Sequence, residues 1–200
     1  MAQRIGLTGG IGSGKSTVLQ MLVAHGAAGV DADAISRATT APDGAAIPLI
    51  AQHFGPEFVG PDRALDRVRM RERAYRDPDA RRQLEAIIHP LVGQEVERQA
   101  RAAMDGGARC IVFDIPLLVE SGRWRSRLDR VLVVDCSPAT QIARVTARSG
   151  LAPAEVEAII AAQAPRGLRL AAADLVICNE ALTLDGLRAE VAQAARSFGL

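Results

Sequence analysis

The stretch Gly9-Gly10-Ile11-Gly12-Ser13-Gly14-Lys15-Ser16-Thr17 decides the fold of this chain of 200 residues. A short apolar run, Ile5-Gly6-Leu7-Thr8, precedes it, and a segment with the apolar spacing of a helix follows. The pattern G-x-x-x-x-G-K-S between a strand and a helix is that of a phosphate-binding loop. Its glycines let backbone N–H groups turn toward an anion, and the helix adds the positive end of its dipole. We therefore expect Lys15 to contact the β- and γ-phosphates of a nucleotide and Ser16 to supply a hydroxyl ligand for Mg²⁺.

Lys15 is the only lysine among the 24 basic side chains, and the other 23 are arginines. The compact ammonium of lysine suits a point contact to phosphate inside a tight loop, whereas the planar fork of arginine suits bidentate pairing. Since no second lysine exists, the guanine-selecting Asn-Lys-x-Asp segment of a P-loop GTPase is excluded.

Composition argues against a macromolecular or membrane partner. The net charge is +1 with interspersed signs, and aromatic residues make up 3% of the chain, so neither a basic surface nor base-stacking platforms for nucleic acid are expected. No apolar stretch reaches the ~20 residues of a membrane span, and no basic and apolar leader precedes the first strand. We expect a cytoplasmic protein that binds neither nucleic acid nor membranes.

Cysteine and histidine give no sign of metal or redox chemistry. Cys110, Cys136 and Cys178 each lie in or beside an apolar run, which predicts small buried side chains in a reducing compartment. The three histidines lie far apart in the sequence, without the spacing of metal ligands.

Five apolar segments are expected to form strands, and helical segments connect them. The segments are residues 4–8, 27–30, 109–114, 130–135 and 174–179. Buried strands with helical connections predict an α/β fold, in which helices cover both faces of a parallel sheet.

Two insertions are expected in this core, which comprises residues 1–34, 107–136 and 173–200 of a single domain. From about 35 to 106 the pattern is helical, with separate helices on either side of Pro90, and the block is large enough for a substrate-holding subdomain. From about 137 to 172, a helix-turn-helix carries arginines suited to a lid that folds over a nucleotide. These arginines are Arg144, Arg148, Arg166 and Arg169.

Asp31 and Asp33 follow the second strand, at the sheet edge where open α/β folds bind their ligands. The same residue types also suit a solvated turn or a helix cap, and the sequence leaves both interpretations open.

Several stretches of this chain resemble the dephospho-coenzyme A kinase family, and the resemblance covers nearly the whole sequence. They are the loop at residues 7–17, Val30-Asp31-Ala32-Asp33, Leu65-Asp66-Arg67, the segment 84–90 that ends in His89-Pro90, the segment 114–122 around Pro116-Leu117-Leu118, and Ala173-Asp174 with Asn179. The resemblance implies a P-loop fold like that of nucleoside monophosphate kinases, with the strand order 2-3-1-4-5. It also implies phosphorylation of the ribose 3′-hydroxyl of dephospho-CoA by ATP.

The resemblance further implies roles for individual residues. Asp33 is expected to orient or deprotonate the acceptor hydroxyl, Arg144 and Arg148 to close over the phosphates of ATP, and Asn179 to lie near adenine. The helical block is expected to bind the acceptor through Arg67, Arg71 and His89. A salt-bridged solvent face for the arginines and a structural hydrogen bond for the histidine are the alternatives.

Another small-molecule kinase of the same architecture, acting on shikimate or a nucleoside monophosphate, is the remaining alternative. Such enzymes can also place an acid after the second strand. The helical insertion is long for a shikimate kinase, which favours dephospho-CoA as the acceptor.

Overall fold

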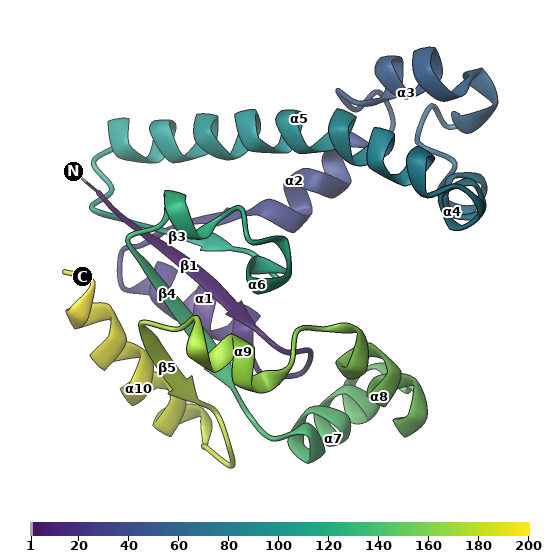
Figure 1. The fold of residues 1–200 in the computed structure, drawn as a ribbon. Coiled ribbons are helices and arrows are strands. Elements are labelled where there is room, and N and C mark those ends of the chain that lie inside the picture. Colours follow the sequence, from purple (N-terminus) through teal and green to yellow (C-terminus); the bar gives the residue numbers. More distant parts are fainter. Residues whose placement is uncertain (1) are drawn as a thin grey trace. The chain divides into compact units, whose positions relative to one another are not determined.

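A computed structural model describes residues 2–200, which divide into two compact units. The first unit contains the chain up to Val30 together with Ala102–Leu200, and the second contains Asp31–Arg101. Figure 1 labels the α-helices and every strand except β2. The segment predicted as a lid, at about 137–172, belongs to the first unit.

The first unit is built on a five-stranded sheet with the order β2-β3-β1-β4-β5 (Figure 1). The strands are β1 (Gln3–Gly9), β2 (Ala28–Asp31), β3 (Cys110–Asp114), β4 (Arg130–Asp135) and β5 (Leu175–Cys178). β1 pairs in parallel with both β3 and β4, and β4 pairs in parallel with β5. The predicted α/β fold and the expected strand order are confirmed.

One face of the sheet packs against two helices, α1 (Lys15–Ala24) and α10 (Leu184–Ser197). Ile5 and Leu7 of β1 alternate with residues that face the other side, as the two-residue period of a strand requires. Val18 and Leu22 of α1 lie four residues apart, on one helix face, and are fully buried in the same cluster. This core fixes the end of β1 relative to the start of α1, where the phosphate-binding loop lies.

Two short elements after β3 and three helices after β4 complete the first unit. On the opposite face of the sheet, a Cβ atom at Gly6 would meet the side chains of Leu118 and Leu128, from α6 (Leu118–Ser121) and the residue after η2 (Arg125–Arg127). After β4 come α7 (Pro138–Ser149), α8 (Pro153–Ala162) and α9 (Arg166–Ala171). The Ser137 hydroxyl caps α7 by accepting from Thr140 N, as its sequence predicts.

The second unit is helical and has a small core of its own. Its elements are α2 (Ala32–Thr39), α3 (Ile47–Phe54), η1 (Pro56–Phe58), α4 (Arg67–Arg76) and most of α5 (Pro78–Asp105). Ile50 and Met70 are buried at its centre, and Phe54 packs against Phe58 with ring centroids 5.8 Å apart.

The prediction of two helices separated at Pro90 is wrong, because α5 runs without interruption from Pro78 to Asp105. Proline inside a helix removes one backbone hydrogen bond and crowds the preceding turn. Ile87, Ile88 and Leu91, on both sides of the proline, pack against the same apolar cluster of the second unit. We infer that this continuous apolar contact offsets the local cost of Pro90.

The cysteine prediction holds for two residues and is wrong for the third. Cys110 and Cys136 are buried free thiols, and burial raises the pKa of Cys110 to about 11. Cys178 is exposed. It lies at the end of β5, an edge strand that has a neighbour on one side only.

Candidate functional site

The phosphate-binding loop lies between the carboxyl end of β1 and the first turn of α1. Gly12 and Gly14 have positive φ angles of 73° and 94°, a region that side chains with a Cβ atom rarely adopt. Ser13 N donates to Gly10 O over 3.1 Å and closes a turn inside the loop. The loop therefore needs its glycines for its backbone shape.

Three consecutive carbonyl groups of the loop accept hydrogen bonds from side chains of other elements. Ile11 O accepts from Gln141 Nε2 (2.7 Å), Gly12 O from Arg144 NH1 (3.5 Å) and Ser13 O from Asn179 Nδ2 (2.8 Å). Arg144 NH2 also donates to Asn179 O over 3.0 Å. Two predicted site residues, Arg144 and Asn179, are thus brought together at the loop, and both contact its backbone.

Lys15 forms an ion pair with Asp114, the last residue of β3. The two side chains are only 15% and 9% exposed. Because β3 is next to β1 in the sheet, the carboxylate at its end reaches the lysine that begins α1. This partner holds the ammonium group beside the loop instead of leaving it in solvent.

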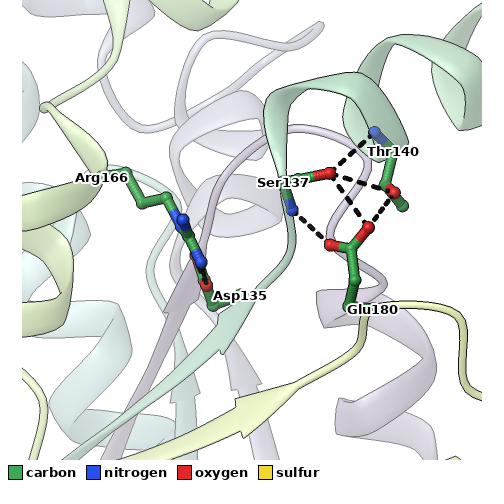
Figure 2. A network of polar contacts seen from close by, with 5 residues as sticks. All are labelled: Asp135, Ser137, Thr140, Arg166 and Glu180. Atoms are coloured by element: carbon green, nitrogen blue, oxygen red, sulfur yellow. Dashed lines mark hydrogen bonds and ion pairs between the residues drawn. The ribbon is translucent and has the colours of Figure 1, made fainter.

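A second polar network follows the end of β4 (Figure 2). Arg166 binds the carboxylate of Asp135 through Nε, 3.0 Å from each oxygen, and through NH2, 2.6 Å from Oδ2. Asp135 raises the pKa of Arg166 through these hydrogen bonds and its charge. Glu180, in the turn after β5, accepts from Ser137 N (2.5 Å), Ser137 Oγ (3.0 Å) and the Thr140 hydroxyl. The Thr140 and Ser137 donors lower the pKa of Glu180.

The other two arginines of the predicted lid differ in their surroundings. Arg148 is exposed, and its Nε donates to the adjacent Ser149 hydroxyl. Arg169 is only 4% exposed, and its NH1 donates to Ala164 O. A Cβ atom at Gly10 would lie 3.0 Å from Arg169 NH2, so this guanidinium approaches the loop. Among the predicted lid arginines, Arg144 and Arg169 lie at the loop, and Arg148 has no loop contact among the described residues.

The two acids after β2 have different roles in the second unit. Asp31 is the N-cap of α2, where its Oδ1 accepts from Ala34 N over 2.7 Å. Asp33, in the first turn, forms an exposed ion pair with Arg37 one helical turn later. The capping interpretation is therefore correct for Asp31, while Asp33 presents its carboxylate at the surface of this unit.

The predicted acceptor residues also lie in the second unit. Arg67 NH2 donates to Thr40 Oγ1 over 2.9 Å. Arg71 is exposed and makes no ion pair or side-chain hydrogen bond within residues 2–200. His89 is half-buried inside α5.

The sequence did not identify several residues that shape the loop. Gln141 contacts Ile11 across 130 positions of sequence, and Glu180 contacts Ser137 across 43. Neither contact leaves a periodic pattern. Asp114 and Asp135 could have been identified from the sequence, because each is an acid that directly follows an apolar run at the carboxyl end of a strand, where α/β sheets bind their ligands.

A parallel sheet with a phosphate-binding loop after its first strand, a lone lysine in that loop and arginines around it defines a P-loop kinase. A family model described as dephospho-CoA kinase matches residues 3–185. The chain therefore belongs to the dephospho-CoA kinase family.

Individual relatives agree with this assignment. A dephospho-CoA kinase of Albidiferax ferrireducens is 61% identical over 197 residues, which cover 98% of this chain and 93% of the relative. The solved structure of TT1252 from Thermus thermophilus has a TM-score of 0.83 at 32% identity, covering 98% of this chain and 97% of the other. The dephospho-CoA kinase from Campylobacter jejuni, at 22% identity, shares the fold with a TM-score of 0.70 and the same coverage.

Family membership confirms the predicted enzyme class, a kinase with ATP as co-substrate and a small-molecule acceptor. It favours dephospho-CoA over shikimate or a nucleoside monophosphate as that acceptor. None of the helices in the described part of the chain combines the length and apolarity that a membrane span needs.

Proposed function

We propose that this enzyme transfers the γ-phosphoryl group of ATP to the ribose 3′-hydroxyl of dephospho-CoA, and that residues 9–17 hold the donor. The observation that carries the donor assignment is the phosphate-binding loop with the chain's lone lysine, Lys15, fixed beside it by Asp114. Phosphoryl transfer needs positioning and neutralisation of charge on the transferred group. The ammonium of Lys15 supplies that charge at the β- and γ-phosphates.

The loop also fits a bound Mg²⁺ ion. The hydroxyl of Ser16 is exposed in the first turn of α1 and makes no hydrogen bond with a described residue. Residues 2–200 contain no group of three or more metal-ligating side chains. Mg²⁺ is usually held by one or two protein oxygens, with substrate phosphates and water completing its shell. Ser16 would hold the ion, which when bound neutralises charge on the phosphates.

The second unit contributes the acceptor side of the proposal. A carboxylate within hydrogen-bond reach of a hydroxyl can accept its proton late in a loose transition state. Asp33 is an exposed carboxylate whose partner, Arg37, is itself exposed, and such surface pairs are weak enough for a substrate to replace. Arg67, Arg71 and His89 are the proposed acceptor-binding residues, with exposed Arg71 suited to an anionic group.

The predicted domain organisation and the remaining roles complete the proposal. The segment 137–172 acts as a lid in which Arg144 and Arg148 contact the phosphates of ATP, and Asn179 lies near adenine. A cytoplasmic location is supported by three free cysteines, since secreted proteins usually oxidise theirs. The near-neutral net charge of the chain supports an enzyme without a nucleic-acid partner.

An acceptor panel tests the proposed reaction. ADP release from ATP is measured with dephospho-CoA, shikimate and nucleoside monophosphates side by side, and the site of phosphorylation in the product is read by ³¹P and ¹H NMR. We expect turnover with dephospho-CoA alone and a phosphate on the ribose 3′-oxygen. Turnover only with one of the other acceptors would refute the proposal.

A further inference from the structure

The hydrogen bond between Gln141 and Ile11 determines the direction of a neighbouring backbone N–H group. In a planar trans peptide, the carbonyl of one residue and the N–H of the next point in opposite directions. Gln141 Nε2 donates to Ile11 O over 2.7 Å. The N–H of Gly12 therefore points away from Gln141.

The same relation holds two residues later in the loop. Asn179 Nδ2 donates to Ser13 O over 2.8 Å, so the N–H of Gly14 points away from Asn179. Gly14 is the N-cap of α1, and the N–H groups of the first helical turn lack partners within the helix. In each of these two peptides, the bound carbonyl leaves the next N–H group directed away from the side chain that binds it.

Two other N–H groups of the loop already have partners. Ile11 N donates to Gln163 Oε1 over 3.0 Å, and Ser13 N donates to Gly10 O over 3.1 Å. Within residues 2–200, the N–H groups of Gly12 and Gly14 donate to no other residue. These two N–H groups are therefore among the donors that the loop offers to an anion.

Gln141 is held beside the loop by its burial and by the packing around it. The residue is 2% exposed, and a Cβ atom at Gly10 would lie 2.1 Å from Gln141 Nε2. The loop can approach the amide only because Gly10 has no side chain. The helix that carries Gln141 is fixed at its start by Glu180, which binds Ser137 and Thr140 (Figure 2).

We propose that Gln141 is a positioning residue for phosphoryl transfer: its hydrogen bond to Ile11 O turns the Gly12 N–H toward the phosphates of the donor. The inference rests on the proposed binding of ATP at residues 9–17. Gln141 itself touches the loop backbone and no reacting atom. Its loss is expected to weaken recognition of phosphate while the acceptor side stays unchanged.

Gln141→Met tests the inference, because methionine keeps the length and volume of glutamine and lacks the donor. Affinities for ATP and for inorganic tripolyphosphate are measured by calorimetry, and KM is measured for ATP and for dephospho-CoA. The bond that is weakened is the one from the Gly12 N–H to a charged phosphate. We therefore expect both affinities to fall about tenfold. The KM for dephospho-CoA is expected to stay at its wild-type value.

Two further variants separate positioning from general damage. Gln141→Asn keeps a buried amide that is one methylene too short to reach Ile11 O, and we expect the same loss of affinity. Gln193→Met replaces an exposed glutamine on α10 and is expected to leave both affinities unchanged. The melting temperature of each ligand-free variant checks its fold.

The outcomes distinguish the two proposals. If wild-type enzyme binds both ligands and the folded Gln141 variants bind them equally well, the positioning role is overturned. An equal rise in the KM of ATP and of dephospho-CoA would also overturn it, because a loosened structure affects both sides. If the wild-type enzyme binds neither ligand, the proposed donor site itself is refuted.

Discussion

Arg166 holds the carboxylate of Asp135 with two guanidinium nitrogens, Nε at 3.0 Å from both oxygens and NH2 at 2.6 Å from Oδ2. The pair is asymmetric in its exposure to water. The side chain of Arg166 is 48% exposed, whereas that of Asp135 is 5% exposed. Asp135 therefore depends on Arg166 for its stabilisation more than Arg166 depends on Asp135. Water can solvate the half-exposed guanidinium but hardly reaches the buried carboxylate.

This asymmetry predicts that the two partners are not equally important for stability. Arg166→Met leaves a buried carboxylate without its cation, which is costly, whereas Asp135→Asn leaves a half-exposed arginine that water can solvate. We expect the melting temperature to fall more for Arg166→Met. Arg188→Met, in the exposed Arg188–Asp185 pair of α10, is the matched control and should leave the melting temperature nearly unchanged. Equal effects at Arg166 and Asp135 would contradict this account.

The lone lysine gives the sharpest activity prediction. Removing one preorganised donor to a developing charge typically lowers kcat by about 10²–10³-fold, and Lys15→Ala is expected to lose at least that much. Lys15→Arg should not restore activity, because a planar guanidinium does not replace a compact ammonium in a tight loop. Single-turnover transfer from radiolabelled ATP measures both variants. Near-normal turnover in Lys15→Ala would refute the role of the ammonium.

The outcome at the loop shows what the sequence could and could not predict. The loop and the strands on either side were predictable, since local spacing and apolar runs specify them. The need for glycine at position 10 was only partly predictable. Glycine was expected for an anion, and the structure adds that Gln141 needs the space, a contact between segments 130 residues apart.

Helix ends were predictable where a capping side chain is local, as at Ser137 and Thr183. The continuity of α5 through Pro90 was not predictable, because packing on both sides of the proline overrides the tendency of proline to interrupt a helix. On the acceptor side, residue type and position did not show whether Asp31 or Asp33 caps the helix that follows. Only the hydrogen bond from Ala34 N identifies Asp31 as the cap.

Asp31 and Asp33 also form a matched pair for testing the acceptor side. Asp33→Asn is expected to lower kcat by about 10²–10⁴-fold, the range for a group that accepts a proton, with the KM for ATP unchanged. Asp31→Asn removes a charge two residues away and keeps an equally good N-cap, so we expect near-normal kcat and stability. If ATP affinity collapsed in Asp33→Asn while kcat held, the acid would instead be a structural or metal-binding residue.

Glu180 predicts how stability depends on pH. Hydrogen bonds from Thr140 and Ser137 lower the pKa of Glu180 from its ordinary value of 4.5. A carboxylate with a lowered pKa in the folded state binds its proton more weakly there than in the unfolded chain. Its contribution to stability is therefore complete above pH 4.5 and is lost as the pH falls through the lowered value.

Glu180→Gln removes this titration, since glutamine carries no charge at any pH. We expect a lower melting temperature than wild type near pH 7, because the amide accepts fewer of the three hydrogen bonds that reach Glu180. Between pH 5 and pH 3 the difference should shrink, because protonation of Glu180 removes the same interactions from the wild-type enzyme. Melting curves at half-unit pH steps measure the convergence. Parallel curves for the two proteins over this range would show that the hydrogen bonds at the start of α7 do not depend on the charge of Glu180.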